Sequence, residues 1–187
     1  MGRWEPNASG RLRQAAMELY LERGFEQTTV AEIAERAGLT ARTFFRYFAD
    51  KREVLFAGSV SLQEHLVDAL DGVPDSASPM EAIATALDAA ASVLGQHREY
   101  SRQRQFVIAA NMELRERELI KMASMAMALA DGLRRRGVHD PNASLAAEAG
   151  VAVLRVAFER WVSEPADQDL SDVMRESLDQ LRTLTAG

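Results

Sequence analysis

The sequence has 187 residues, 47% of them hydrophobic, and a formal net charge of −6. This apolar content supports a folded core and excludes a wholly disordered chain, and the absence of cysteine excludes disulfides and thiolate-bound metal. No apolar stretch reaches the roughly 18 residues needed to cross a bilayer and no signal peptide is recognisable, so we expect a cytoplasmic protein without a membrane partner.

Three helical patterns fill the first 50 residues. Apolar residues recur at helical spacing between residues 9 and 23, and Gly24 ends this helix. Thr29 and Glu32 form a capping box that opens a second helix, which Gly38 terminates. Thr40 then caps a third helix with the sequence ARTFFRYF. Two short helices joined by a tight turn are typical of a helix-turn-helix that binds double-stranded DNA.

The third helix has two unlike faces. Phe44 and Phe48 form an apolar face, and the other side carries polar and aromatic groups: Ala41, Arg42, Thr43, Phe45, Arg46 and Tyr47. A helix in the major groove needs such groups, since arginine reads guanine and threonine meets phosphates or thymine methyls. The alternatives are a solvated helical hairpin and, for Arg42, a surface ion pair with Glu35 or Glu53.

The rest of the chain also follows helical patterns. Asp50 and Glu53 have the spacing of another capping box, from which we expect a fourth helix that continues to about Leu70. A linker over residues 72–78 follows, and Ser78 with proline after it marks a fifth helix. Apolar periodicity predicts further helices over about residues 99–110, 113–136, 141–161 and 170–184. No stretch alternates as a strand does, so the predicted fold is all-α with about nine helices.

The charge is unevenly distributed. Residues 1–56 carry nine Lys or Arg and eight Asp or Glu, a net charge of +1, whereas residues 57–187 carry thirteen and twenty, a net charge of −7. The acidic surplus therefore lies outside the helix-turn-helix. A net charge of only +1 predicts modest non-specific affinity for DNA, so that specific binding depends on where individual charges lie.

A longer pattern surrounds the three helices and consists of Gly24-Phe25, Thr28-Thr29-Val30, Ile33-Ala34, Ala37-Gly38-Leu39-Thr40, Thr43, Phe45, Tyr47-Phe48, Lys51 and Leu55. With this pattern, residues 9–56 resemble the N-terminal domain of the TetR/AcrR family of bacterial transcriptional regulators. The resemblance implies a homodimer that binds a palindromic operator in double-stranded DNA. It further implies a repressor that a small apolar or amphipathic ligand releases from the operator.

The resemblance also implies residue roles. It places four residues near base edges: Ala41, Arg42, Thr43 and Phe45. It places four at phosphates: Thr29, Thr40, Tyr47 and Lys51. Three of these are expected at helix N-termini, where backbone N–H groups and the helix dipole attract anions: Thr29, Thr40 and Lys51. Many relatives carry a basic residue where this chain has Ala41, which limits that position to a methyl contact. Three arginines are candidates for further DNA contacts, with plain surface charge as the alternative: Arg3, Arg11 and Arg13.

The C-terminal part is expected to bind a small-molecule effector. It is rich in methionine, which suits irregular apolar pockets. The candidate contacts are Leu62, Leu66, Tyr100, Phe106, Met122 and Met125, and ordinary core packing is the alternative for each. Residues 111–123 are similar to a subgroup of the family whose ligands are acyl-CoA-like. In that case four arginines would meet phosphates, with pairing to neighbouring acids as the alternative: Arg98, Arg102, Arg104 and Arg115.

The last two helices, which are the eighth and ninth, are expected to form the homodimer interface. The first of them carries a stripe of mostly small residues: Ala146, Ala149, Gly150, Val153, Ala157 and Trp161. The second offers Leu170, Val173, Met174, Leu178, Leu181 and Leu184. Two such helices from each chain would form a four-helix interface, and packing within one chain is the alternative.

We expect no catalytic residues, metal or cofactor, because the sequence contains no Ser-His-Asp set, metal-ligand spacing, P-loop or GxGxxG. The predicted organisation is a DNA-binding domain at residues 1–56 and a ligand-binding and dimerisation domain at residues 57–187. The ligand would tilt the fourth helix and change the separation of the two recognition helices. A binding protein with a vestigial DNA-binding domain is the competing interpretation, and Arg42, Tyr47 and Lys51 argue against it.

Overall fold

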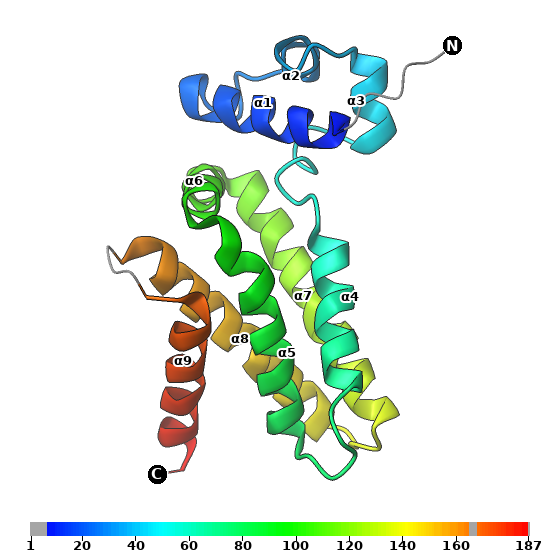
Figure 1. The fold of residues 1–187 in the computed structure, drawn as a ribbon, viewed down its shortest axis with the longest axis vertical. Coiled ribbons are helices and arrows are strands. Elements are labelled where there is room, and N and C mark those ends of the chain that lie inside the picture. The colour runs from blue at the N-terminus through cyan, green and yellow to red at the C-terminus, as the bar shows by residue number, and fades with distance from the viewer. Residues whose placement is uncertain (1–6, 165–167, 187) are drawn as a thin grey trace. The chain divides into compact units, whose positions relative to one another are not determined.

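The computed structural model describes residues 7–164 and 168–186, and Figure 1 shows its helices. They are α1 (Ala8–Arg23), α2 (Val30–Arg36), α3 (Ala41–Tyr47), α4 (Ser59–Asp71), α5 (Pro79–Leu94), α6 (Arg98–Ala109), α7 (Met112–Arg135), α8 (Asn142–Ser163) and α9 (Leu170–Thr185). One turn of 3₁₀-helix, Gly95–His97, joins α5 to α6. Strands are absent from the described residues, which confirms the predicted all-α class.

The chain divides into two compact units. The first, which we call the head, contains the chain up to residue 57 together with residues 103–118. The second contains residues 58–102 and the chain from residue 119 onwards. Helices α6 and α7 therefore contribute to both units. The sequence pattern predicts residues 103–118 as part of the C-terminal domain, because nothing local distinguishes them from the rest of that domain.

Helices α1, α2 and α3 pack against one another around the core of the head. Leu12, Ile33 and Phe44 are fully buried between them. The predicted capping box at the start of α2 is confirmed, since Thr29 accepts a bond from the Glu32 backbone N–H and the Glu32 carboxylate accepts one from the Thr29 N–H. These local bonds fix where the short helices begin, and the buried apolar side chains hold them together.

The predicted start of the fourth helix at Asp50 is wrong. The Asp50 carboxylate does accept bonds from the backbone N–H groups that follow it, but residues 51–58 form turns and α4 begins only at Ser59. The backbone at Gly58 has a φ of 89°, a left-handed conformation that separates these turns from α4. Val54, Leu55 and Phe56 are all buried.

The second unit has one apolar core, to which α4, α5, α7, α8 and α9 contribute. The capping box and the N1 proline predicted at Ser78 are confirmed at the start of α5, which contacts α4, α8 and α9. Gly150 of α8 lies so close to α5 that a Cβ there would be 2.6 Å from the Ile83 Cγ2 atom. Small residues on α8 therefore allow two helices of the same chain to approach closely.

This packing corrects the predicted dimer stripe. Ala146, Gly150, Val153, Ala157 and Trp161 are all buried within the chain, so they are not available to a partner. The α9 residues Leu170, Val173, Met174 and Leu178 are buried in the same core. These residues therefore pack within one chain, which was the alternative to a dimer interface. Helix α5 covers the face of α8 that carries the small side chains.

Candidate nucleic-acid interface

The buried residues of α3 determine which of its side chains are exposed. Phe44 and Phe48 are buried, which fixes the rotation of α3, and the Phe44 ring lies 5.5 Å from each of the rings of Phe45 and Phe48. The opposite side then carries the side chains predicted to read DNA. Ala41, Arg42, Arg46 and Tyr47 are exposed, Thr43 is half-buried, and 58% of Phe45 is accessible. The structure thus brings the α3 candidates together on one accessible helix.

Arg42 is the clearest candidate for reading a base. Among the described residues it forms no ion pair with Glu35 or Glu53, the alternative that the sequence left open. Glu53 instead pairs with Arg117, whose Nε lies 2.6 Å from the carboxylate. The Arg42 guanidinium therefore extends from the first turn of α3 without a competing carboxylate from either residue.

Arg46 and Tyr47 support each other at the end of α3. The Arg46 guanidinium lies 5.0 Å from the centre of the Tyr47 ring, and its Nη2 donates to the tyrosine hydroxyl at 3.1 Å. A cation over an aromatic face is stabilised by the ring quadrupole. The pair therefore presents a positive charge and a hydroxyl that are already oriented, both of which suit contacts to DNA phosphates.

The two capping threonines are engaged within the head. The Thr40 hydroxyl oxygen accepts from the Thr43 N–H at 3.1 Å, and the Thr29 hydroxyl donates to the Glu32 carboxylate at 2.8 Å. Bonds from the Thr29 backbone and hydroxyl lower the pKa of Glu32, with a smaller contribution from nearby Arg23. A carboxylate that stays ionised lies beside Thr29, so a phosphate there would meet repulsion as well as a donor. The phosphate roles of these threonines stay predictions.

Lys51 does not lie at a helix N-terminus, contrary to expectation. It belongs to the turns after α3, and its Nζ donates to the backbone carbonyls of Phe25 at 2.8 Å, Thr28 at 3.0 Å and Glu26 at 3.3 Å. The ammonium also lies 4.3 Å from the centre of the Phe25 ring. The contact that the resemblance assigns to this lysine therefore competes with several bonds inside the head.

The N-terminal arginines differ in what the structure describes. Arg3 lies outside the described residues. Arg11 donates to the carbonyls of Ala37 and Gly38, and so it holds the turn between α2 and α3. Arg13 is half-buried. Of these three, Arg11 has an identified role, which is to brace the helix-turn-helix from α1.

A group of ion pairs in the head was not foreseen from the sequence. We call it the α6–α7 corner, and it joins the end of α6 and the start of α7 to the turns after α3. Arg104 donates from Nε to the Leu55 carbonyl at 2.7 Å and lies 5.1 Å from the Phe56 ring. Its partner Glu118 lies 3.2 Å away. Two further pairs cross the corner, Arg117 with Glu53 at 2.6 Å and Arg52 with Glu113 at 2.7 Å. No local sequence signal points to these contacts, because their partners are 49–64 residues apart except Arg104 and Glu118.

The predicted effector contacts are only partly brought together. Leu66 and Met125 lie in the core of the second unit, and Leu62 and Met122 pack against it. Tyr100 is half-buried in the same unit. Phe106, in contrast, belongs to the head and has 69% of its surface exposed. The structure thus groups the residues from α4 and α7, and it separates Phe106 from them.

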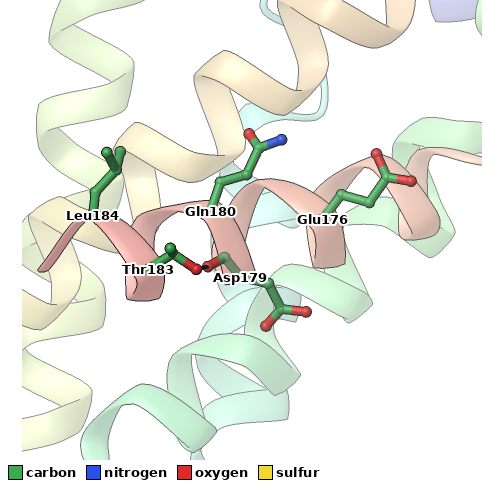
Figure 2. A pocket seen from close by; sticks show the side chains of 5 residues that line it. All are labelled: Glu176, Asp179, Gln180, Thr183 and Leu184. Carbon is green, nitrogen blue, oxygen red and sulfur yellow. Dashed lines mark hydrogen bonds between the residues drawn. The ribbon is translucent and has the colours of Figure 1, made fainter. Parts of the chain in front are cut away.

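An open groove of about 620 Å³ lies along α9 (Figure 2). Its lining residues all come from this helix and are Glu176, Asp179, Gln180, Thr183 and Leu184. In Figure 2, Glu176, Gln180 and Leu184 extend from the same side of α9, as their four-residue spacing requires. The groove contains two carboxylates and none of the expected effector contacts, so it differs from the apolar site predicted from the sequence.

Two other kinds of feature are absent from residues 7–164 and 168–186. Within that part of the chain, no three His, Asp or Glu side chains are grouped so that they could hold a metal ion. None of the helices there is both long enough and apolar enough to cross a bilayer.

Comparison with known proteins identifies both parts of the chain. Residues 12–57 match the family of bacterial regulatory proteins called tetR, and residues 77–186 match the MftR C-terminal domain. The transcriptional regulator TcmR of Streptomyces glaucescens is 40% identical over 88 residues, which are 47% of this chain and 38% of TcmR. The putative mycofactocin biosynthesis regulator MftR of Mycobacterium tuberculosis is 25% identical over 167 residues, which are 88% of this chain and 84% of MftR.

Solved structures share the fold. The regulator FadR of Bacillus subtilis, determined in complex with stearoyl-CoA, has a TM-score of 0.66 and 21% identity, and the match covers 92% of this chain and 96% of FadR. The matches to the first curated relatives span less than half of their length, 38% and 45%. The MftR-type match, however, extends over more than half of this chain. This protein therefore belongs to the TetR family of bacterial regulatory proteins, with a C-terminal domain of the MftR type.

Proposed function

We propose that this regulator is a homodimeric repressor that binds a palindromic operator through α3 and leaves it when an apolar or amphipathic effector binds. The observation that carries this proposal is the exposed side of α3, where Arg42 pairs with neither Glu35 nor Glu53 in the described part of the chain and Arg46 is stacked on Tyr47. Phe44 and Phe48 are buried and anchor α3, while Arg42, Arg46 and Tyr47 stay exposed, which supports a working head over a vestigial one.

Exposed apolar residues on α8 support the dimer. Leu145, Ala149, Ala152 and Val156 follow one another at helical spacing on a face of α8 that the core does not cover, and Leu145 is 65% exposed. We call these four residues the outer stripe of α8. Leu184 on α9 is also exposed and borders the α9 groove. An apolar stripe on a water-facing helix favours association with a second copy, and two half-sites need two recognition helices.

The effector is proposed to enter the core of the second unit. Leu62, Leu66, Met122 and Met125 are there, and methionine side chains adapt to a guest more readily than branched ones do. FadR, which shares the fold, was solved with stearoyl-CoA, and this makes a long-chain acyl-CoA the first effector to test. Three of the arginines expected at its phosphates have other partners. Arg98 donates to the carbonyls of Trp161 and Glu164, Arg102 pairs with Glu99 at 3.0 Å, and Arg104 pairs with Glu118. The acyl chain is therefore the part of such a ligand that the core supports best.

Release from DNA is proposed to act through the α6–α7 corner. Residues 51–58 are turns, so α4 is not a continuous lever from the recognition helix into the effector unit. Helices α6 and α7 instead belong to both units, and Arg104 and Arg117 bind the turns after α3. An effector that displaces either helix acts on those turns, and it shifts the balance only by its different affinity for the two forms.

Selection of duplexes from a random pool at about 0.15 M salt tests the proposal, because salt strongly affects the outcome. We expect a palindrome with two half-sites whose centres lie about one helical turn apart, or a multiple of one turn apart. The selected duplex is then titrated with stearoyl-CoA, and we expect release. Absence of any enriched sequence from a folded, dimeric preparation would count against the function itself. Enrichment without release would count only against this class of effector.

A further inference from the structure

Lys51 is the only lysine in the head, where every other basic residue is arginine. Its ammonium has three N–H donors and no acceptor. The bonds to Phe25, Glu26 and Thr28 use one donor each, at 2.8, 3.3 and 3.0 Å. The Phe25 ring covers a further side of the ammonium at 4.3 Å. A phosphate could reach this charge only if it displaced one of these bonds.

The carbonyls that Lys51 binds belong to the turn between α1 and α2. This turn begins at Gly24, whose φ is 89°, and it is closed by the buried Thr28, whose hydroxyl donates to the Gly24 carbonyl at 2.9 Å. Carbonyl dipoles that converge on one point repel each other unless a cation lies between them. The ammonium therefore stabilises a turn that the backbone would not hold as firmly alone.

The main chain of Lys51 is tied to the same place. Its carbonyl accepts a bond from the hydroxyl of Tyr20 at 2.6 Å, and the Tyr20 ring is buried and meets the Phe25 ring edge-on at 5.3 Å. Lys51 lies four residues after the end of α3. One residue thus joins the end of α1, the turn before α2 and the segment after α3.

We infer that Lys51 is a positioning residue, which orients the recognition helix by holding the α1–α2 turn, and that its charge does not contact DNA. This inference rests on the proposed DNA-binding function, and it differs from the phosphate contact that the family resemblance assigns to Lys51. An arginine cannot replace the lysine, because a planar guanidinium does not converge on three carbonyls as a compact ammonium does.

Charge-conserving and charge-removing variants separate the two roles. Operator affinity is measured against salt concentration for Lys51→Arg and Lys51→Met, with Arg46→Met as the matched control on exposed α3. We expect both Lys51 variants to lose affinity for the selected operator by about tenfold or more, while affinity for a random duplex changes by less than about twofold. The salt slope should stay unchanged for both, whereas Arg46→Met should reduce it by about 0.9. A loss of stability alone would not change the ratio of specific to random affinity in folded protein. The inference would be overturned if Lys51→Arg kept full affinity for the operator and Lys51→Met showed a smaller salt dependence of that affinity.

The native protein allows a second test if the variants do not fold. The chain has only two lysines, so the ammonium groups give two nitrogen-15 signals, which Lys121→Arg assigns. We expect the Lys51 ammonium hydrogens to exchange slowly in the free protein and its signal to stay in place when the operator binds. Fast exchange in the free protein, or a phosphorus coupling in the complex, would contradict the positioning role. If the protein binds no operator, slow exchange in the free protein still tests the contacts of Lys51, so the two failures are distinguishable.

Discussion

The side chains of α3 differ in how the head holds them, and this difference separates two kinds of DNA contact. Arg42 extends from the first turn without a carboxylate partner at Glu35 or Glu53, so its donors are available to a base edge. Tyr47 carries a hydroxyl that already accepts a bond from Arg46. A base-reading side chain affects one position of the operator, whereas a phosphate-binding one affects every sequence alike.

We therefore expect Arg42→Ala to weaken binding to the selected operator by about 1–3 kcal/mol and to relax one base position in each half-site. Tyr47→Phe should weaken binding to all duplexes by similar factors, because the hydroxyl that it removes is expected at a phosphate. Repeating the duplex selection with each variant measures both effects. An equal loss at every sequence in Arg42→Ala would show that this arginine contacts phosphate.

At the scale of elements, the α6–α7 corner gives the turns after α3 partners that their own sequence does not supply. Arg104 is the central residue, since it binds the Leu55 carbonyl, covers the Phe56 ring and pairs with Glu118. Side chains of this pair are about one-fifth exposed, at 19% and 20%, so water weakens the pair less than it weakens a surface ion pair.

We expect Arg104→Met to destabilise the head by about 1–3 kcal/mol, because it leaves a carbonyl and a largely covered carboxylate without their partner. Hydrogen exchange should accelerate at residues 51–57. Arg102→Met is the matched control on the same helix, since the Arg102 side chain is 63% exposed and pairs with exposed Glu99. Its effect should stay within about 0.5 kcal/mol. Equal exchange in the two variants would show that the corner does not hold these turns.

The turn at Asp50 should make the head sensitive to acid. Hydrogen bonding from Arg52 lowers the pKa of Asp50, with further bonds from the backbone of Glu53 and Arg52. A carboxyl whose pKa falls on folding adds stability that is fully present above its ordinary pKa of 3.8 and is lost as the pH falls below that value. We expect the free energy of unfolding, measured at several values between about pH 5 and pH 3, to fall in the native protein. The decrease should be smaller in Asp50→Asn. Identical acid profiles would exclude a role for this carboxyl.

For the whole molecule, the exposed apolar surface on α8 is one feature that the single chain leaves unexplained. Leu145 and Val156 lie at the two ends of the outer stripe. The neighbouring small residues of α8, such as Gly150, are buried against α5. Helix α8 therefore buries one face in the core of its own chain and exposes another face to solvent. A partner chain is the natural cover for such a surface.

We expect Val156→Glu to shift the protein from dimer to monomer in sedimentation velocity and to abolish tight binding to a two-half-site operator. Arg155→Gln, at a neighbouring exposed position, is the control and should leave the dimer intact. The circular dichroism of both variants should match that of the native protein, since neither position lies in the core. A dimeric Val156→Glu protein would move the interface away from this stripe.

Features that depend on residues three or four positions apart follow from the sequence without further information. Capping boxes at Thr29 and Ser78 began the helices where they were predicted, and Phe44 set which side of α3 faces out. Tertiary structure alone decided the rest, because a local pattern does not say which distant group a side chain meets. Lys51 turns inward to carbonyls 23–26 residues away, and Arg117 reaches a carboxylate 64 residues away. Gly150 is buried against α5 of the same chain, although its small-residue stripe predicted contact with a second chain.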